Sequence, residues 1–169
     1  MKIFSRNRIM VWGLVGGMIF CSCQDRPSFS GYAHVDRMGW YGEDTVVMEI
    51  QRADTTRRNV PRQVCDMQVG IRYTADYAYK DFSMLVELVS GKHVVARDTI
   101  LFHLFDEKGR ALGRGLERYD MVQPSLRVAL KADKPYAVRM THLMRLNPVQ
   151  GITDVSCSFD SVLHPFAEE

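Results

Sequence analysis

The sequence has 169 residues, the size of one ordinary domain, with 22 basic and 20 acidic side chains and a formal net charge of +2. Its apolar fraction of 46% and charged fraction of 25% are those of a globular protein and argue against a disordered chain. The small net charge, without a cationic stripe, argues against nucleic-acid binding.

The first 22 residues have the pattern of a signal peptide. Lys2, Arg6 and Arg8 precede an apolar run from Ile9 to Phe20. A helix of this length is too short to cross a hydrocarbon core of roughly 30 Å. A basic start, a short apolar run and then small or polar residues are typical of a secretory signal peptide. We therefore expect residues 1–22 to be removed.

Two cysteines, Cys21 and Cys23, follow the apolar run. A zinc site needs about four ligands, and no second Cys/His pair lies nearby. Cysteines separated by one residue also rarely meet disulfide geometry with each other. The stretch FCSC resembles a bacterial lipobox, where a signal peptidase cuts before a cysteine that becomes acylated. Because Ser22 is small and Phe20 is not, we expect the lipid on Cys23.

Cleavage before Cys23 changes the charge of the chain. The mature protein would have 147 residues, with 19 basic and 20 acidic side chains and a net charge of −1. Each buried methylene of the acyl chains contributes about 0.8 kcal/mol, so several chains would form a lasting anchor. We expect residues 23–31 to form a polar lipidated tether, 32–163 a folded domain and 164–169 a C-terminal tail.

Alternating apolar and polar residues dominate the expected domain and predict half-buried strands. No window of 12 residues has a convincing helical period, and turn signals occur at 90–93, 106–109 and 131–135. The pattern predicts an all-β protein, an antiparallel β-sandwich of jelly-roll or Ig-like type. About eight strands are expected, at 32–35, 46–51, 64–73, 82–89, 94–105, 125–130, 136–144 and 152–162. The strand at 94–105 has apolar residues on both faces and is expected at the centre of a sheet.

Two cysteines, Cys65 and Cys157, lie on apolar faces of expected strands. Export would place them in a compartment that permits disulfides, so the two could pair in the core. The alternative is two buried thiols that pack as small apolar side chains. A disulfide requires their Cα atoms to lie within about 7 Å of each other.

The sequence offers no catalytic or metal-binding motif. It contains no H-E-x-x-H, no G-x-S-x-G elbow, no complete P-loop and no EF-hand spacing. We therefore predict no enzyme activity, no catalytic or metal-binding residue and no small-molecule cofactor. His103 and His142 lie in expected strands, where a surface or hydrogen-bonded role is more common than metal binding. The arginine-containing segment 52–63 is expected to be a solvated connection.

Four aromatic residues could form an exposed binding surface: Trp40, Tyr41, Tyr77 and Tyr79. Tyrosine and tryptophan offer rigid contact area to a sugar or a protein. The alternative is that these rings cap one end of the core. The two functions to be separated are thus a lipid-anchored adaptor that binds protein partners and a lipid-anchored carbohydrate-binding module.

Several stretches together resemble the gliding-motility lipoprotein family GldH. They are GWYGEDTVVMEI (39–50), DYAYKDFSMLVEL (76–88), DEKGRALGRG (106–115) and MRLNPVQGITDV (144–155). In the second stretch, Ala78 and Asp81 stand where the family commonly has Pro and Asn. The resemblance implies a membrane-anchored envelope lipoprotein of the outer membrane, on its periplasmic face or at the cell surface. It also implies partners among gliding- or secretion-associated envelope proteins and no enzyme activity.

Overall fold

The computed structural model describes residues 29–36, 38–50, 62–131 and 134–161. Over these ranges the chain forms strands and no helix, which confirms the predicted all-β class. The strands are β1 (Phe29–His34), β2 (Val46–Ile50), β3 (Arg62–Thr74), β4 (Asp81–Ser90), β5 (His93–His103), β6 (Arg114–Gly115), β7 (Arg118–Lys131), β8 (Tyr136–His142) and β9 (Ile152–Ser161). The expected signal peptide, Cys23 and the tail 164–169 lie outside the described residues, as does most of the segment 52–63.

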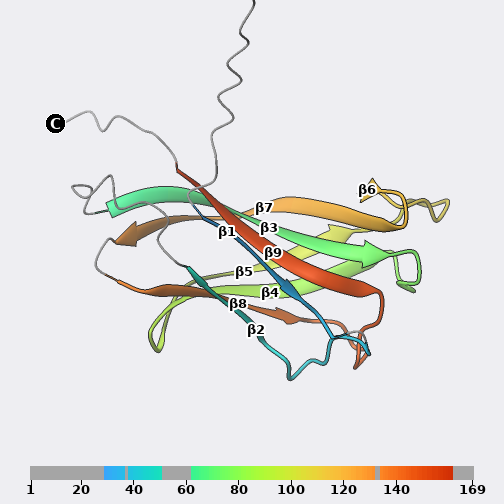
Figure 1. Ribbon diagram of the computed structural model, residues 1–169, viewed down its shortest axis with the longest axis horizontal. Coiled ribbons are helices and arrows are strands. Elements are labelled where there is room, and N and C mark those ends of the chain that lie inside the picture. The colour runs from blue at the N-terminus through green and yellow to red at the C-terminus, as the bar shows by residue number, and fades with distance from the viewer. Residues whose placement is uncertain (1–28, 37, 51–61, 132–133, 162–169) are drawn as a thin grey trace, which may run out of the picture.

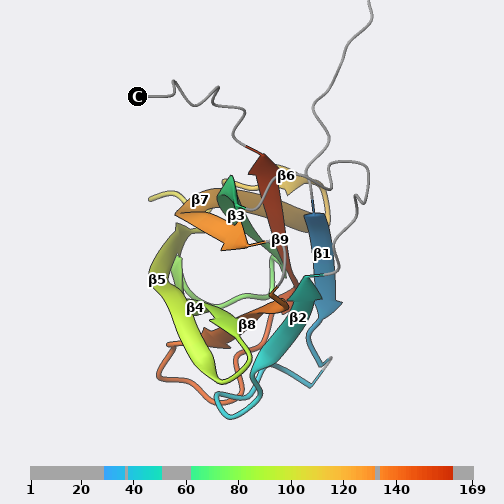
Figure 2. The same cartoon turned by 90° about the vertical axis from the view of Figure 1, so that its left-hand side faces the viewer.

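The strands form two antiparallel sheets packed face to face (Figures 1 and 2). One sheet has the order β1-β9-β3-β7-β6 and the other β2-β8-β4-β5. β4 pairs with β5, β3 with β7, β2 with β8 and β1 with β9, so the chain pairs as one long nested hairpin rolled into two layers. This is jelly-roll connectivity, and it decides between the two sandwich types that the sequence left open.

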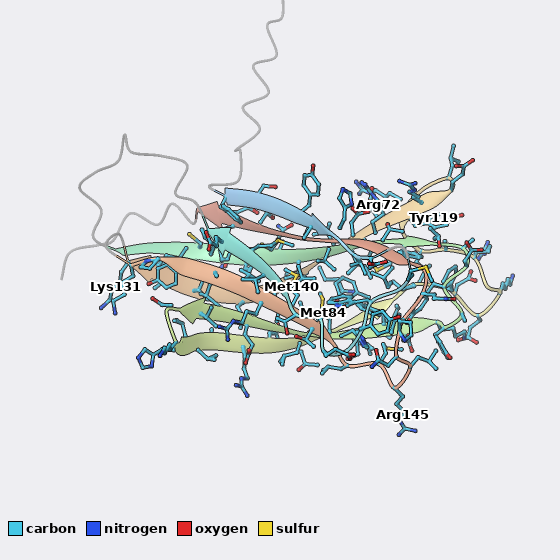
Figure 3. All side chains as sticks on the ribbon, turned by 60° about the horizontal axis from the view of Figure 1, so that its bottom comes forward. Arg72, Met84, Tyr119, Lys131, Met140 and Arg145 are labelled. Carbon is cyan, nitrogen blue, oxygen red and sulfur yellow. The ribbon has the colours of Figure 1, made fainter. Side chains whose placement is uncertain are left out.

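The core lies between the sheets and is built by alternate residues of each strand. In β4, Phe82, Met84, Val86 and Leu88 are fully buried, as the alternation predicted. Met84 and Met140, from neighbouring strands, lie between the layers in Figure 3. Burying a large apolar side chain contributes about 1.5–3 kcal/mol, so this face supplies much of the stability of the fold.

β5 lies at the edge of its sheet, so the prediction that it is central is wrong. Its inward residues Ile100 and Phe102 are buried, whereas Val95 and Leu101 are about half exposed. Apolar residues on both faces of a strand therefore do not establish that both faces are covered. Here one face packs in the core and the other is open to solvent.

β7 begins seven residues before the predicted strand at 125–130. Its first half alternates exposed and half-buried residues and includes Pro124, which cannot donate a hydrogen bond to the neighbouring strand. The pairing of β7 with β3 shifts between the pairs Gln68–Pro124 and Asp66–Arg127, as at a β-bulge. A bulge is where a sheet accommodates proline, and this explains why the strand could continue through it.

The folded domain begins earlier than the sequence suggested. Phe29 is already paired with Phe159 of β9, and Gly31 is paired with Cys157. The last three residues of the predicted tether, 29–31, therefore belong to the sandwich. The segment between Cys23 and the folded domain is correspondingly shorter than predicted.

The sandwich has two ends with different loops. At one end β1, β3, β5 and β8 begin; we call it the N-terminal end. At the other, the connections β1–β2, β3–β4, β5–β7 and β8–β9 lie together; we call it the loop end. In Figure 3, Lys131 marks the N-terminal end and Arg145 marks the loop end. β3 has 13 residues, so the two ends are about 43 Å apart along this strand.

Candidate functional site

The loop end is held together by hydrogen bonds between connections that are far apart in the sequence. Trp40 and Val149 exchange two backbone hydrogen bonds of 2.8 Å, which join the β1–β2 and β8–β9 connections. The Tyr73 hydroxyl donates to the carbonyl of Leu104 at 2.8 Å and accepts from the amide of Gly113 at 2.9 Å. These bonds fix the backbone of three connections relative to the core.

Asn147 and Glu43 extend this network to the surface. Asn147 Oδ1 accepts from the amide of Gly42 at 2.8 Å, and its Nδ2 donates to Glu43 Oε2 at 3.0 Å. The hydrogen bond from Asn147 lowers the pKa of Glu43 below its ordinary value. The side chain of Asn147 thus ties the β8–β9 connection to the β1–β2 connection.

The turn after Leu104 is organised by Asp106. Its Oδ1 accepts from the backbone amides of Lys108 and Arg110, both at 2.8 Å, and its Oδ2 accepts from Arg110 Nε at 2.7 Å. The backbone hydrogen bond from Arg110, helped by its side chain, lowers the pKa of Asp106. Gly109 has φ of 74°, a value suited to glycine, so the sequence DEKG forms the predicted turn.

Exposed apolar side chains lie on the connections that make up this end. Leu116 is 91% exposed and Met38 is 71% exposed. Among the described residues, 13 large hydrophobic side chains are exposed, and seven lie on the connections of the loop end: Met38, Tyr41, Tyr79, Leu112, Leu116, Leu143 and Leu146. Exposed apolar groups on a rigid backbone can bind a partner at little cost in conformational entropy.

Below this surface lies a buried histidine. His142 is 5% exposed, and its ring meets Trp40 edge-on at a centroid distance of 5.5 Å. Its Nδ1 accepts from the amide of Met144 at 3.3 Å, and its buried Nε2 has no hydrogen-bond partner within the described part of the chain. Burial lowers the pKa of His142, which favours the neutral form of the ring.

The four aromatic residues that could have formed one exposed surface do not lie together on the surface. Trp40 and Tyr77 are 1% and 4% exposed and belong to the core, as in the alternative that these rings cap one end of it. The Trp40 indole donates to the carbonyl of Asp44 at 2.7 Å, and the Tyr77 hydroxyl donates to that of Asp81 at 2.7 Å. Only Tyr41 and Tyr79 of the four are exposed.

His103 has the surface role that its strand position suggested. Its ring is exposed, and Nδ1 lies 2.7 Å from Asp81 Oδ1 on the neighbouring strand. No cluster of three or more potential metal ligands occurs within residues 29–36, 38–50, 62–131 and 134–161. These same ranges contain no helix that is long and apolar enough to cross a membrane.

Cys65 and Cys157 are both buried thiols on the core face of neighbouring strands. Cys157 is paired with Val69, four positions along β3 from Cys65, so the two are separated by about 13 Å along the strand. This exceeds the Cα separation that a disulfide tolerates. Burial raises the pKa of Cys157 to about 12, and its thiol lies 3.7 Å from the sulfur of Met48.

Sequence reasoning missed Leu112, Leu116 and Met38. Leu112 and Leu116 lie in the glycine-containing segment GRALGRGL (109–116), where the glycines suggested a loop and the leucines were not considered as a binding surface. The overlooked signal is the presence of leucines between glycines and arginines, outside any strand pattern. Such leucines have no core to enter, and here they remain exposed.

The comparisons with known proteins show one family, and two of the similar solved structures are described here. The family model described as GldH lipoprotein matches residues 28–158. Eiger TNF from S. frugiperda is 12% identical, with 85% of this chain and 99% of that chain covered and a TM-score of 0.31. Dimeric latent PorU from Porphyromonas gingivalis is 10% identical, with 80% of this chain and 13% of that chain covered and a TM-score of 0.34. These TM-scores are too low to bear on function. The search of curated proteins found no match.

Proposed function

Because the chain belongs to the GldH lipoprotein family, a family of lipid-anchored cell-envelope proteins, we propose that it is a non-enzymatic adaptor that binds an envelope protein through its loop end. The observation that carries the proposal is the fixed loop end with its exposed apolar side chains, among them Leu112 and Leu116. The partner belongs to a gliding- or secretion-associated assembly, and the anchor lies in the outer membrane.

The proposed anchor also sets the orientation of the domain. Cys23 precedes Phe29, the first residue of β1, by six positions, and six residues span at most about 21 Å. The N-terminal end of the sandwich would therefore stay close to the membrane. The loop end, about 43 Å further along β3, would point away from it, where another protein can reach it.

Metabolic labelling with an acyl-chain analogue tests the anchor. Wild-type protein and Cys21→Ala should incorporate the label, and Cys23→Ala should not. Because Cys21 is two residues away, it provides a matched control for the effect of losing a cysteine. Label that persists in Cys23→Ala would contradict the anchor assignment.

Crosslinking and affinity purification of the full lipoprotein from detergent-extracted membranes test the adaptor function. We expect one envelope protein at a constant ratio, and we expect Leu112→Ser/Leu116→Ser to lose it. Val94→Ser/Val95→Ser is the matched control, because these two valines are also exposed but lie at the N-terminal end of β5. Equal recovery with both double variants, or repeated recovery of the lipoprotein alone, would refute the adaptor function.

A further inference from the structure

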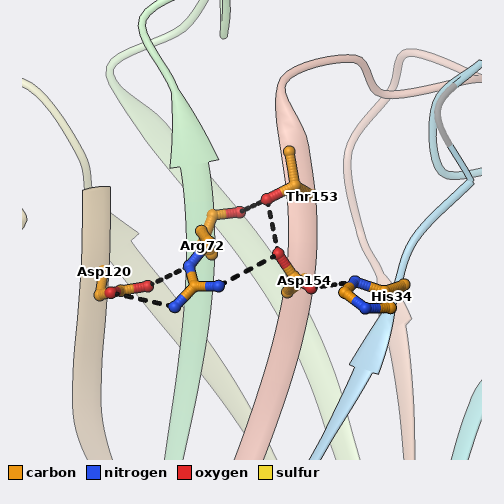
Figure 4. A network of polar contacts seen from close by, with 5 residues as sticks. All are labelled: His34, Arg72, Asp120, Thr153 and Asp154. Carbon is orange, nitrogen blue, oxygen red and sulfur yellow. Dashed lines mark hydrogen bonds and ion pairs between the residues drawn. The ribbon is translucent and has the colours of Figure 1, made fainter. Parts of the chain in front are cut away.

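The outer face of the five-stranded sheet carries a row of ionisable side chains across four strands (Figure 4). His34, Asp154, Arg72 and Asp120 are successive partners in β1, β9, β3 and β7. Arg72 Nε donates to Asp120 Oδ1 at 2.7 Å, and its Nη2 donates to Oδ2 at 3.3 Å. The guanidinium also lies 3.9 Å from Asp154 Oδ2. The row therefore presents planar groups in fixed orientations.

Asp154 is the most deeply placed member of the row. Its side chain is 10% exposed, and the Thr153 hydroxyl lies 2.8 Å from Oδ2. His34 Nδ1 contacts the other carboxylate oxygen. These neighbours limit rotation of the carboxylate, so its position is set before any ligand arrives.

The next row contains the smallest residues of this face and forms a hollow. Tyr32, Ser156, Gly70 and Val122 are successive partners in the same four strands. Gly70 and Ser156 lie in the middle, between the largely exposed side chains of Tyr32 and Val122. A cavity of about 420 Å³ is lined by Tyr32, Ser156 and Val122 of this row and by Arg72, Asp120 and Asp154.

Gly70 lies buried beneath the hollow and leaves room for the side chain of Ser156, which lines the cavity. A Cβ atom at this position would lie 2.4 Å from Ser156 Oγ and 3.2 Å from a methyl group of Val122. Its φ is not in the left-handed region, so the glycine is needed here for space. A larger residue at Gly70 would therefore displace the Ser156 hydroxyl and disturb the lining of the cavity.

We propose that this hollow, which we call the sheet groove, binds a neutral saccharide. The exposed ring of Tyr32 offers a flat apolar surface to the C–H face of a sugar ring. Beside it, the oriented carboxylate and guanidinium groups of Asp120 and Arg72 can accept and donate hydrogen bonds to neighbouring hydroxyls. The cavity volume is within the usual range for small-molecule sites, about 300–1,000 Å³.

Other ligand classes fit the sheet groove less well. Phosphates and carboxylates would meet the charges of Asp120 and Asp154, and a cation would compete with Arg72, which already pairs with both. An extended peptide cannot add to the sheet here, because β3 and β9 are paired on both sides. The sheet groove adjoins the loop end, but none of its lining residues is among the seven exposed apolar side chains there, so this proposal does not depend on the adaptor function.

Calorimetric titration of the full lipoprotein tests this site, in a zwitterionic detergent that contains no sugar. The probes are neutral hexasaccharides of glucose, mannose, galactose and N-acetylglucosamine. We expect at least one to bind, and we expect Tyr32→Ala to weaken its binding by about tenfold or more because a stacking surface is lost. Tyr32→Phe, which keeps the ring, should bind within about threefold of wild type.

Two further variants separate the sheet groove from other surfaces. Gly70→Ala should weaken binding by displacing the Ser156 hydroxyl that lines the sheet groove, provided that its unfolding transition shows a folded protein. Tyr32→Ala tests the site regardless. Tyr41→Ala is the control, because this tyrosine is exposed at the loop end. A peptide library is titrated for comparison. The proposal would be overturned if no hexasaccharide binds, or if peptides bind and no hexasaccharide does. It would also be overturned if Tyr41→Ala removes hexasaccharide binding and Tyr32→Ala does not.

Discussion

The aromatic cluster beneath the loop end and the apolar side chains on its surface are similar in chemistry but differ in their surroundings. Phe82 contacts the rings of Trp40, Tyr77 and Phe102 at centroid distances of 6.0–6.4 Å and is fully buried. Leu116, in the connection between β5 and β7, is almost fully exposed. Burial makes the first group a source of stability, whereas exposure leaves the second available for binding.

The largest effect should come from the centre of the buried cluster. Phe82→Ala removes a ring that packs against three others, and we expect the free energy of unfolding to fall by about 3–5 kcal/mol. Urea denaturation followed by fluorescence measures this change. A loss below about 1 kcal/mol would show that the cluster does not support the loop end as described.

A smaller loss of stability is expected when the hydroxyl of Tyr73, which links the core to the β5–β7 connection, is removed. Tyr73→Phe keeps the ring but removes the hydroxyl that joins Leu104 and Gly113, at a cost of about 1–3 kcal/mol. Amide hydrogen exchange should also become faster around Gly113. Tyr119→Phe is the control, because its ring lies beside Tyr73 at 5.4 Å. Equal exchange rates in the two variants would show that the Tyr73 hydroxyl does not hold this connection in place.

The pH dependence of stability tests the buried histidine. Because burial lowers the pKa of His142, the unfolded chain binds this proton more readily than the folded chain. The contribution of His142 to the free energy of unfolding is full above about pH 6.5 and is lost as the pH falls toward the folded pKa. One proton changes this free energy by at most about 1.4 kcal/mol per pH unit.

His142→Phe, which preserves an aromatic ring beside Trp40, should therefore show a weaker loss of stability on acidification than wild type. Thermal unfolding of both proteins between pH 7.5 and pH 5 gives the comparison, and Glu43, the acidic group near His142, is unchanged in the two proteins. Identical pH slopes would show that His142 titrates equally in the folded and unfolded chains.

The smallest effect on stability should come from the exposed leucines. Leu112→Ser/Leu116→Ser should change the free energy of unfolding by no more than about 0.5 kcal/mol, since neither side chain is buried. Urea denaturation of this variant beside Phe82→Ala makes the contrast direct. A loss of several kcal/mol would mean that these leucines stabilise the fold, and the comparison between the two groups would fail.

The alternation of apolar and polar residues in the sequence was sufficient to predict which side of a strand faces the core. The inward residues of β4, including Phe82 and Met84, follow a period of two, because one face of that strand meets the opposite sheet. Alternation could not place β5 at an edge, since strand order depends on contacts with other strands. It also could not show that Trp40, which lies outside the strands, turns into the core and finds a hydrogen-bond acceptor in Asp44.

The two surfaces were harder to predict because they combine residues that are distant in the sequence. Tyr32, Gly70, Val122 and Ser156 come from four strands, and only the strand register brings them into one row. Nothing local distinguishes Gly70 from a glycine in a turn. The loop end likewise depends on the topology that brings four connections together.

Site-specific photocrosslinking in cells tests most directly whether the loop end is the binding surface. A photoreactive amino acid would replace Leu116 at the loop end or Lys92, an exposed residue in the β4–β5 turn at the N-terminal end. We predict that the Leu116 position captures an envelope protein that the Lys92 position does not. Capture of this protein from the Lys92 position alone would contradict the proposed orientation and the loop-end binding surface.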